Sequence, residues 1–86
     1  MEIQDLKLDG NAIGGLLLEL FGAELTAAGS VCAGCGAREE IARLDVYCGA
    51  GIVVRCCHCE QVMIRIVRSP DRTWLDLSGT ATIVLG

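Results

Sequence analysis

The chain has 86 residues and a formal net charge of −4, from 7 basic and 11 acidic side chains. At this length we expect a single domain, residues 1–86, whose small core is marginal without help from a metal, a disulfide or a partner. The acidic charge opposes approach to a phosphate backbone, and one Phe, one Tyr and one Trp provide no platform for stacked bases, so we expect no nucleic-acid partner.

Residues 1–22 are predicted to form a loose lead-in, over residues 1–8, and then a short helix. In "DGNAIGGLLLELFG" the predicted N-cap is Asp9, and Gly22 suits the left-handed position that ends a helix. Leu18 lies off the apolar stripe and is expected to be exposed. The stripe itself follows the helical period and contains Ile13, Leu16, Leu17, Leu20 and Phe21.

We expect neither a signal peptide nor a membrane-spanning segment in this sequence. "MEIQDLKLDG" has no basic segment followed by an apolar one, so we expect no signal peptide. The apolar stretch "IGGLLLELFGA" is too short to span a bilayer, so we expect no membrane segment. We therefore expect a cytoplasmic, reducing location, in which thiolate–metal bonds are favoured over disulfides.

Residues 23–86 change to a period of two, which predicts a small mostly-β (α+β) domain of antiparallel strands behind the N-terminal helix. Alternation begins at residues 25–31, with Leu25, Ala27, Gly29 and Val31 on one face. "GAG", "SPDR" and "SG" are the predicted turns that separate the later strands. Those later strands are predicted at residues 42–48, 52–55, 62–68, 73–77 and 80–85.

The cysteines form two C-x2-C pairs, "CAGCG" and "CCHCE", separated by 20 residues. This spacing is typical of a zinc site with four cysteine ligands, because a tight turn aims two thiolates at one point and two such knuckles complete a tetrahedron. Gly36 follows the first pair, where positive φ relaxes the turn, whereas Glu60 holds the same place in the second. The predicted metal ligands are Cys32, Cys35, Cys56 and Cys59.

Other interpretations of these cysteines remain open. Iron also suits a tetrahedron of four sulfurs, although the paired knuckles of rubredoxins typically lie among aromatic residues. Buried thiols without a metal are a further alternative, and a thioredoxin-like redox pair is less favoured because no βαβ pattern surrounds either motif. A closed site of four cysteines has no free position for substrate, so we expect a structural metal and no catalysis by it.

Three residues near the second pair need separate interpretations. Cys57 has too short a spacing from Cys59 for a knuckle, so we expect an exposed or half-buried tip thiol, with redox sensing as the alternative. His58 is expected to be an exposed loop histidine, with replacement of Cys59 as ligand as a minor alternative. Cys48 falls on the apolar phase of its strand and is expected in the core.

The remaining polar residues show no catalytic set. The single histidine lies in the knuckle, and we find no Ser/His/Asp set or phosphate loop, so we expect neither an enzyme nor a small-molecule substrate. Trp74 is expected as a core or edge anchor. Four arginines lie on neighbouring strands and a turn: Arg55, Arg65, Arg68 and Arg72. We expect them to form a solvated face, and a basic patch for an acidic partner is the less favoured interpretation.

Several segments together resemble a family of short, uncharacterised bacterial proteins with a predicted zinc ribbon, known as a domain of unknown function. These segments are "LDGNAIGGLLLELFG", "LTAAGSVCAGCG", "VYCGAGIVVRCCHC" and "VRSPDRTWLDLSG". The resemblance implies a zinc ribbon at the four cysteines and no known activity. Cys57 and Asp45 depart from it, since the family usually has Pro and often has His at these places.

We therefore predict a zinc-ribbon-like antiparallel sheet with an N-terminal helix. The predicted function is a non-enzymatic zinc module for protein–protein contact or assembly, because 52% hydrophobic residues exceed what so small a core hides. A protein partner or a homo-oligomer is accordingly expected. The alternatives are a redox- or metal-responsive regulator that uses Cys57, and a rubredoxin-like electron carrier.

Overall fold

A computed structural model describes residues 7–85, so most of the expected lead-in lies outside the described residues. Its last part is not loose, because Lys7–Asp9 forms strand β1. The Asp9 side chain accepts a hydrogen bond from the Asn11 backbone N–H at 3.1 Å, which makes it the predicted N-cap. It caps a 3-10 helix, η2 (Gly10–Ile13), which continues as helix α1 (Gly14–Phe21).

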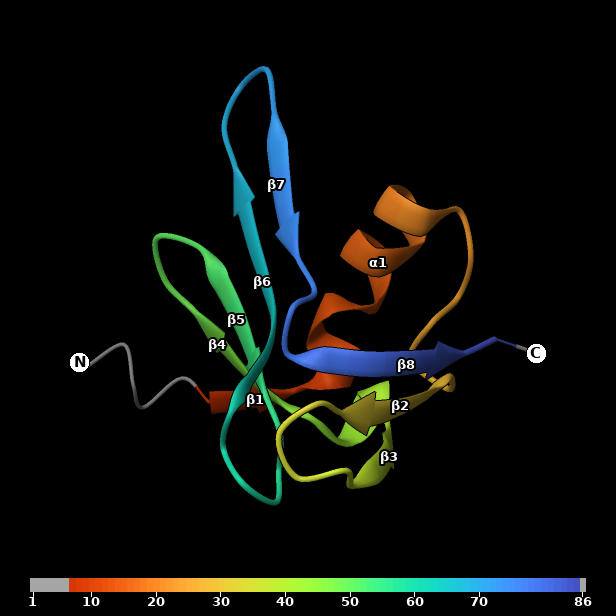
Figure 1. Cartoon of the computed structure of the whole chain (residues 1–86). Coiled ribbons are helices and arrows are strands. Elements are labelled where there is room, and N and C mark those ends of the chain that lie inside the picture. The colour runs from red at the N-terminus through yellow and green to blue at the C-terminus, as the bar shows by residue number, and fades with distance from the viewer. Residues whose placement is uncertain (1–6, 86) are drawn as a thin grey trace.

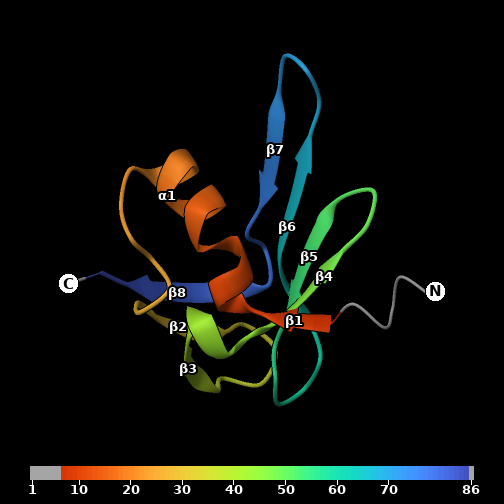
Figure 2. The same cartoon turned by 180° about the vertical axis from the view of Figure 1, so that it is seen from behind.

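Helix α1 ends as the sequence predicts but buries a shorter stripe. Gly22 has φ of +70° and closes the helix with its N–H bonded to the Leu18 carbonyl. Leu17 is buried and Leu18 is half exposed, both as expected. Phe21, however, is 40% exposed, although Leu20 beside it packs against the core. Figures 1 and 2 show helix α1 above strand β8. No helix in residues 7–85 is long and apolar enough to cross a membrane.

The described strands form two antiparallel sheets, which with the N-terminal helix confirms the predicted α+β class (Figure 1). The five-stranded sheet has the order β1-β4-β5-β6-β7 and adds β4 (Asp45–Cys48), β5 (Ile52–Arg55), β6 (Val62–Arg68) and β7 (Thr73–Asp76). The smaller sheet has the order β3-β2-β8 and contains β2 (Gly29–Cys32), β3 (Arg38–Glu40) and β8 (Thr80–Val84).

The first predicted strand differs from β2 in both start and phase. Leu25 lies in a turn before the strand, where its carbonyl accepts from Ala28 N–H at 3.0 Å. Ser30 and Cys32 are the buried residues of β2, not the alternate set. The Ser30 hydroxyl donates to the Glu39 carbonyl at 2.9 Å, and this hydrogen bond compensates for burying a polar side chain. Similarly, a short 3-10 helix, η3 (Ile41–Arg43), replaces the start of the strand predicted at 42–48.

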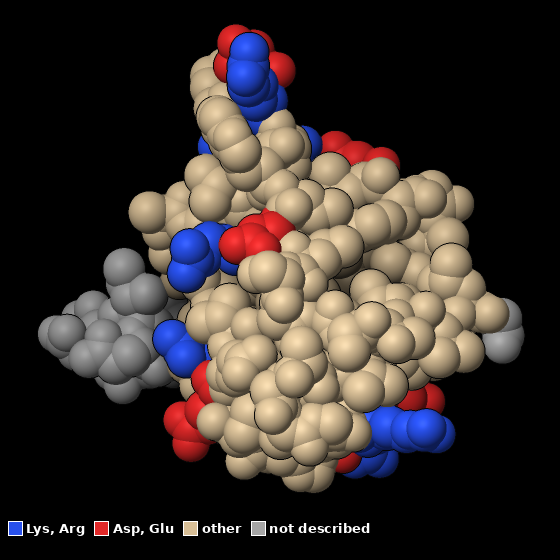
Figure 3. All heavy atoms as spheres, in the orientation of Figure 1, with Lys and Arg blue, Asp and Glu red and all other residues tan. Residues whose placement is uncertain are grey.

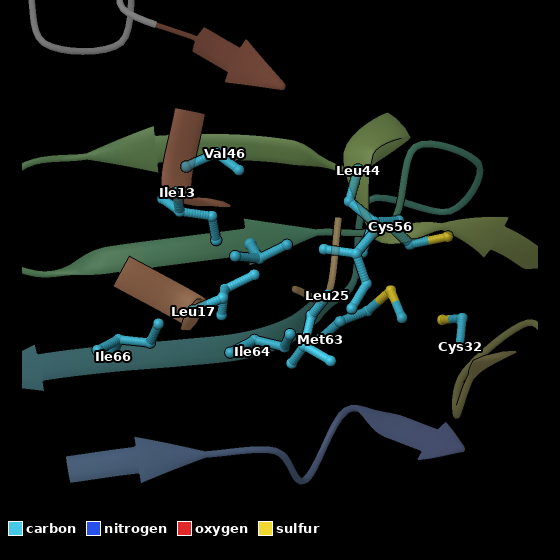
Figure 4. Close-up of a cluster of buried hydrophobic side chains, with 12 residues drawn as sticks. Ile13, Leu17, Leu25, Cys32, Leu44, Val46, Cys56, Met63, Ile64 and Ile66 are labelled. Carbon is cyan, nitrogen blue, oxygen red and sulfur yellow. The ribbon is translucent and has the colours of Figure 1, made fainter. Parts of the chain in front are cut away.

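The core lies between the helical segment and the larger sheet, and it ends at two cysteines. Cys48 packs against this core, as expected. Figure 4 shows Cys32 and Cys56 together at one end of the cluster. The buried members are Ile13, Leu17, Leu25, Cys32, Ile41, Leu44, Val46, Val54, Cys56, Met63, Ile64 and Ile66.

The connection from β7 to β8 joins the two sheets beside this end of the core. A Cβ atom on Gly79 would lie 1.8 Å from the Val62 carbonyl oxygen, so only glycine permits this approach. The Gly79 carbonyl accepts from Ala33 N–H at 3.0 Å, and the Thr80 hydroxyl donates to the Met63 carbonyl at 2.9 Å. These contacts hold the first knuckle of one sheet against β6 of the other.

Candidate metal centre

Two hairpins from different sheets supply the candidate site. Cys32 ends β2 and Cys35 lies in the turn that follows, and the turn between β5 and β6 holds Cys56 and Cys59. The four sulfur atoms all lie within 4.8 Å of one another. The structure therefore brings together the four cysteines that the spacing selected, and these form a group that can hold a metal ion.

The sulfur separations fit a tetrahedral ion. Cys32 Sγ lies 3.7 Å from Cys59 Sγ, and Cys35 Sγ lies 3.7 Å from Cys56 Sγ. A tetrahedron with metal–sulfur bonds of about 2.3 Å has edges of about 3.8 Å. Both short contacts join one knuckle to the other, so the two hairpins are already at the spacing that an ion between them requires.

The two knuckles have matching backbone hydrogen bonds. In each, the first cysteine sulfur accepts an N–H from two residues later at 3.3 Å, donated by Gly34 and by His58. In each, the first cysteine also bonds through its carbonyl and its N–H to residues four and five positions later. These bonds are Gly36 N to Cys32 O (2.9 Å), Glu60 N to Cys56 O (3.0 Å), Cys32 N to Ala37 O (3.0 Å) and Cys56 N to Gln61 O (2.9 Å).

The closing residue of each knuckle has a left-handed backbone. Gly36 has φ of +76° and Glu60 has φ of +67°. Glu60 has the only positive φ of a non-glycine residue between residues 7 and 85, and an L side chain is disfavoured there. The Arg55 guanidinium donates to the Glu60 carbonyl at 2.9 Å and so helps to hold this turn. The sequence expectation that Glu60 is the less comfortable of the two is confirmed.

Electrostatics in the cluster favour a cation among the sulfurs. Backbone hydrogen bonds, from Cys35 above all, act against desolvation and lower the pKa of the Cys32 thiol to about 7. A backbone hydrogen bond from Gln61 lowers the pKa of Cys59, but desolvation and the neighbouring thiols outweigh it and raise the pKa to about 12. The pKa of Cys35 is also raised by this crowding, so adding a second thiolate without a compensating positive charge is unfavourable.

The site lies at the boundary between core and solvent. Cys32 and Cys56 are each 1% exposed, whereas Cys35 and Cys59 are exposed. A metal here would therefore join the end of the hydrophobic core to two surface turns.

Cys57 and His58 lie at the tip of the second knuckle, outside the four-sulfur group. The Cys57 thiol is exposed, and desolvation together with the nearby Glu39 carboxylate raises its pKa, which lowers its thiolate fraction. His58 does not replace Cys59. It is exposed, as expected, but its Nε2 lies 2.7 Å from the Glu39 carboxylate. This contact was not predicted, because no sequence periodicity links β3 to the knuckle tip.

Two of the four arginines have close partners within the protein. Arg55 lies over the Tyr47 ring at 5.9 Å, and Arg68 pairs with Glu19 at 3.3 Å. Figure 3 shows basic and acidic side chains next to one another on the visible face. The solvated-face interpretation fits this arrangement. Trp74 is 52% exposed on the edge strand β7, so it is an edge residue and not part of the core.

Fold and site together define a small α+β domain in which two hairpins present a four-cysteine cluster suited to a metal ion. A family model matches residues 3–85, and the chain belongs to that family, described as a family of unknown function (DUF6510). A search of curated proteins and a search of solved structures found no match.

Proposed function

We propose that the four cysteines bind one zinc ion and that the protein is a non-enzymatic structural-zinc module. The observation that carries this proposal is the pair of 3.7 Å sulfur contacts between the knuckles. Zinc is the common ion of closed sites with four cysteine ligands, and four protein ligands leave no position for water or substrate. The zinc would therefore hold the two hairpins together without taking part in a reaction.

The metal would contribute directly to folding. Cys32 and Cys56 end the hydrophobic core, so the ion would complete the junction between the two sheets. Zinc binding in small zinc peptides supplies about 10–16 kcal/mol at neutral pH, which exceeds the total stability of most domains. Complete removal of zinc should therefore unfold this protein.

Metal analysis and circular dichroism test this proposal together. We expect one zinc per chain after purification and loss of the native spectrum once a chelator has removed it. Cys32→Ser should lose tight zinc binding, whereas Cys48→Ser, which changes a cysteine outside the cluster, should retain it. A metal-free protein with a native spectrum would contradict a structural role. A coloured protein with one iron per chain would instead support the electron-carrier alternative.

We infer that the contact surface of the protein lies around β8. The exposed fractions are 40% for Phe21, 56% for Val84 and 66% for Leu85. Phe21 and Leu85 share an apolar groove with Ile83, and Figure 3 shows few charged side chains over this part of the visible face. Because β8 is an edge strand, its outer side has no strand partner among the described residues.

We propose that this surface contacts a second copy of the chain through antiparallel pairing of two β8 strands. Two identical edge strands are self-complementary about a twofold axis, and the few local charges give little repulsion. Sedimentation of the zinc-loaded protein should show a dimer. Val84→Lys should dissociate it, and Val67→Lys, at an exposed valine of β6, should not. A monomer at high concentration would contradict self-association and leave a different protein as the partner to be sought.

A further inference from the structure

A second group of metal-ligating atoms lies beside the four cysteines. It consists of a Glu39 carboxylate oxygen, the Cys57 sulfur and a His58 ring nitrogen, all within 4.8 Å of one another. Glu39 comes from β3, whereas Cys57 and His58 come from the tip of the second knuckle. The structural-zinc proposal uses none of these three side chains.

We propose that Glu39, Cys57 and His58 form a second binding site for a divalent transition-metal ion of the zinc type. Carboxylate, thiolate and imidazole are the three side-chain ligands that zinc uses in proteins. A set with sulfur and nitrogen does not suit magnesium or calcium, which prefer oxygen ligands. Three protein ligands leave one coordination position open, so this ion would be exchangeable and accessible to a ligand from solvent.

The geometry requires little movement to receive the ion. His58 Nε2 and Glu39 Oε2 are 2.7 Å apart, and tetrahedral zinc with bonds of about 2.0 Å separates two such ligands by about 3.3 Å. The side chains are 51% and 26% exposed, so they have room to open by this amount. On binding, the Cys57 thiol proton passes to solvent, and the neutral imidazole keeps its proton on the nitrogen that faces away from the ion.

The surroundings of the three ligands favour a cation and hold them in place. The Glu39 carboxylate oxygen lies within 4.8 Å of the other two ligand atoms, so it places negative charge beside an ion bound there. The Glu39 backbone is fixed by the buried Ser30 hydroxyl at 2.9 Å. His58 is fixed by its backbone N–H, which donates to Cys56 Sγ at 3.3 Å. Side-chain substitution at His58 therefore leaves the backbone contact of the first site intact.

The single histidine of the chain makes the second site directly observable. The full chain is first loaded with one equivalent of zinc, and a second equivalent is added while the His58 ring nitrogens are followed by NMR. We expect the second equivalent to shift the His58 ring signals. Glu39→Gln and Cys57→Ser should each weaken this second binding by about tenfold or more, since even indirect partners of metal ligands contribute that much. Glu40→Gln, at the exposed neighbouring carboxylate of β3, should leave it unchanged.

Two results would overturn the second site. One is saturation at one zinc per chain with unchanged His58 signals. The other is a second zinc that binds equally well to the Glu39→Gln and Cys57→Ser variants, which would place it elsewhere. Either result leaves one tightly bound zinc and a folded chain. Failure of the four-cysteine proposal is distinguishable from both, because it removes the first equivalent or its effect on folding.

Discussion

Replacing Glu60 by glycine should stabilise the protein. Glu60 closes the second knuckle with φ of +67°, where an L side chain costs about 1–2 kcal/mol. Glycine removes that cost but adds roughly 0.5–1 kcal/mol of freedom to the unfolded chain. The hydrogen bond from Arg55 is made to the Glu60 backbone carbonyl, so it survives the substitution. The net gain in free energy of unfolding is therefore about 0.5–1 kcal/mol.

Urea unfolding of the metal-loaded protein, at a fixed concentration of free metal, measures this gain. With a slope of about 1 kcal/mol/M for a small domain, the midpoint should rise by about 0.5–1 M. Glu60→Gln removes the charge but retains Cβ, so it should change the free energy of unfolding by less than about 0.5 kcal/mol. Gly36→Ala is the converse change. A Cβ at Gly36 meets no atom within 4 Å, so its loss of about 0.5–1 kcal/mol would be purely conformational.

The backbone explanation would be refuted if Glu60→Gly were no more stable than Glu60→Gln. It would also be refuted if Glu60→Gly lost stability while Gly36→Ala retained it, because the two knuckles have the same φ region and the same closing hydrogen bonds.

Three further substitutions test the fold, one of them with a matched control. Gly79→Ala should cost about 2 kcal/mol or more by thermal unfolding, because its Cβ would overlap the Val62 carbonyl. The control is Gly15→Ala in α1, where the new Cβ would meet no atom within 4 Å. It should instead raise the stability of the protein by roughly 0.5–1 kcal/mol. Equal effects at Gly79 and Gly15 would contradict the close packing at Gly79. Ser30→Ala should cost about 1 kcal/mol in urea, through loss of its hydrogen bond to the Glu39 carbonyl. Asp9→Ala should cost about 1 kcal/mol through loss of the N-cap, and an unchanged midpoint would exclude that role.

Much of the site was predictable because it depends on short-range geometry. The C-x2-C spacing selects Cys32, Cys35, Cys56 and Cys59 and excludes Cys57, since two intervening residues are what a knuckle turn needs. The left-handed backbone at Glu60 was predictable for the same reason, because Glu60 holds the place in the second knuckle that Gly36 holds in the first.

The phase of β2 was not predictable from alternation. An apolar pattern places Gly29 and Val31 inside, but the buried residues are Ser30 and Cys32. Burial of Ser30 depends on a carbonyl nine residues away, and burial of Cys32 depends on the second hairpin. Phe21 shows the same limit, since helical periodicity defines a face but not how far the core extends along it.

The amino-acid sequence alone determined the caps of the N-terminal helix, most of the strands, the two C-x2-C pairs and the turns that hold them. Each depends on residues within a few positions of one another, where spacing and backbone preference suffice. The tertiary structure decided that the two knuckles come from different sheets and that Glu39 meets His58 across 19 positions of the chain. It also left β8 as an edge strand beside an apolar groove. These features depend on how strands pair over long separations, and residue spacing does not specify that pairing.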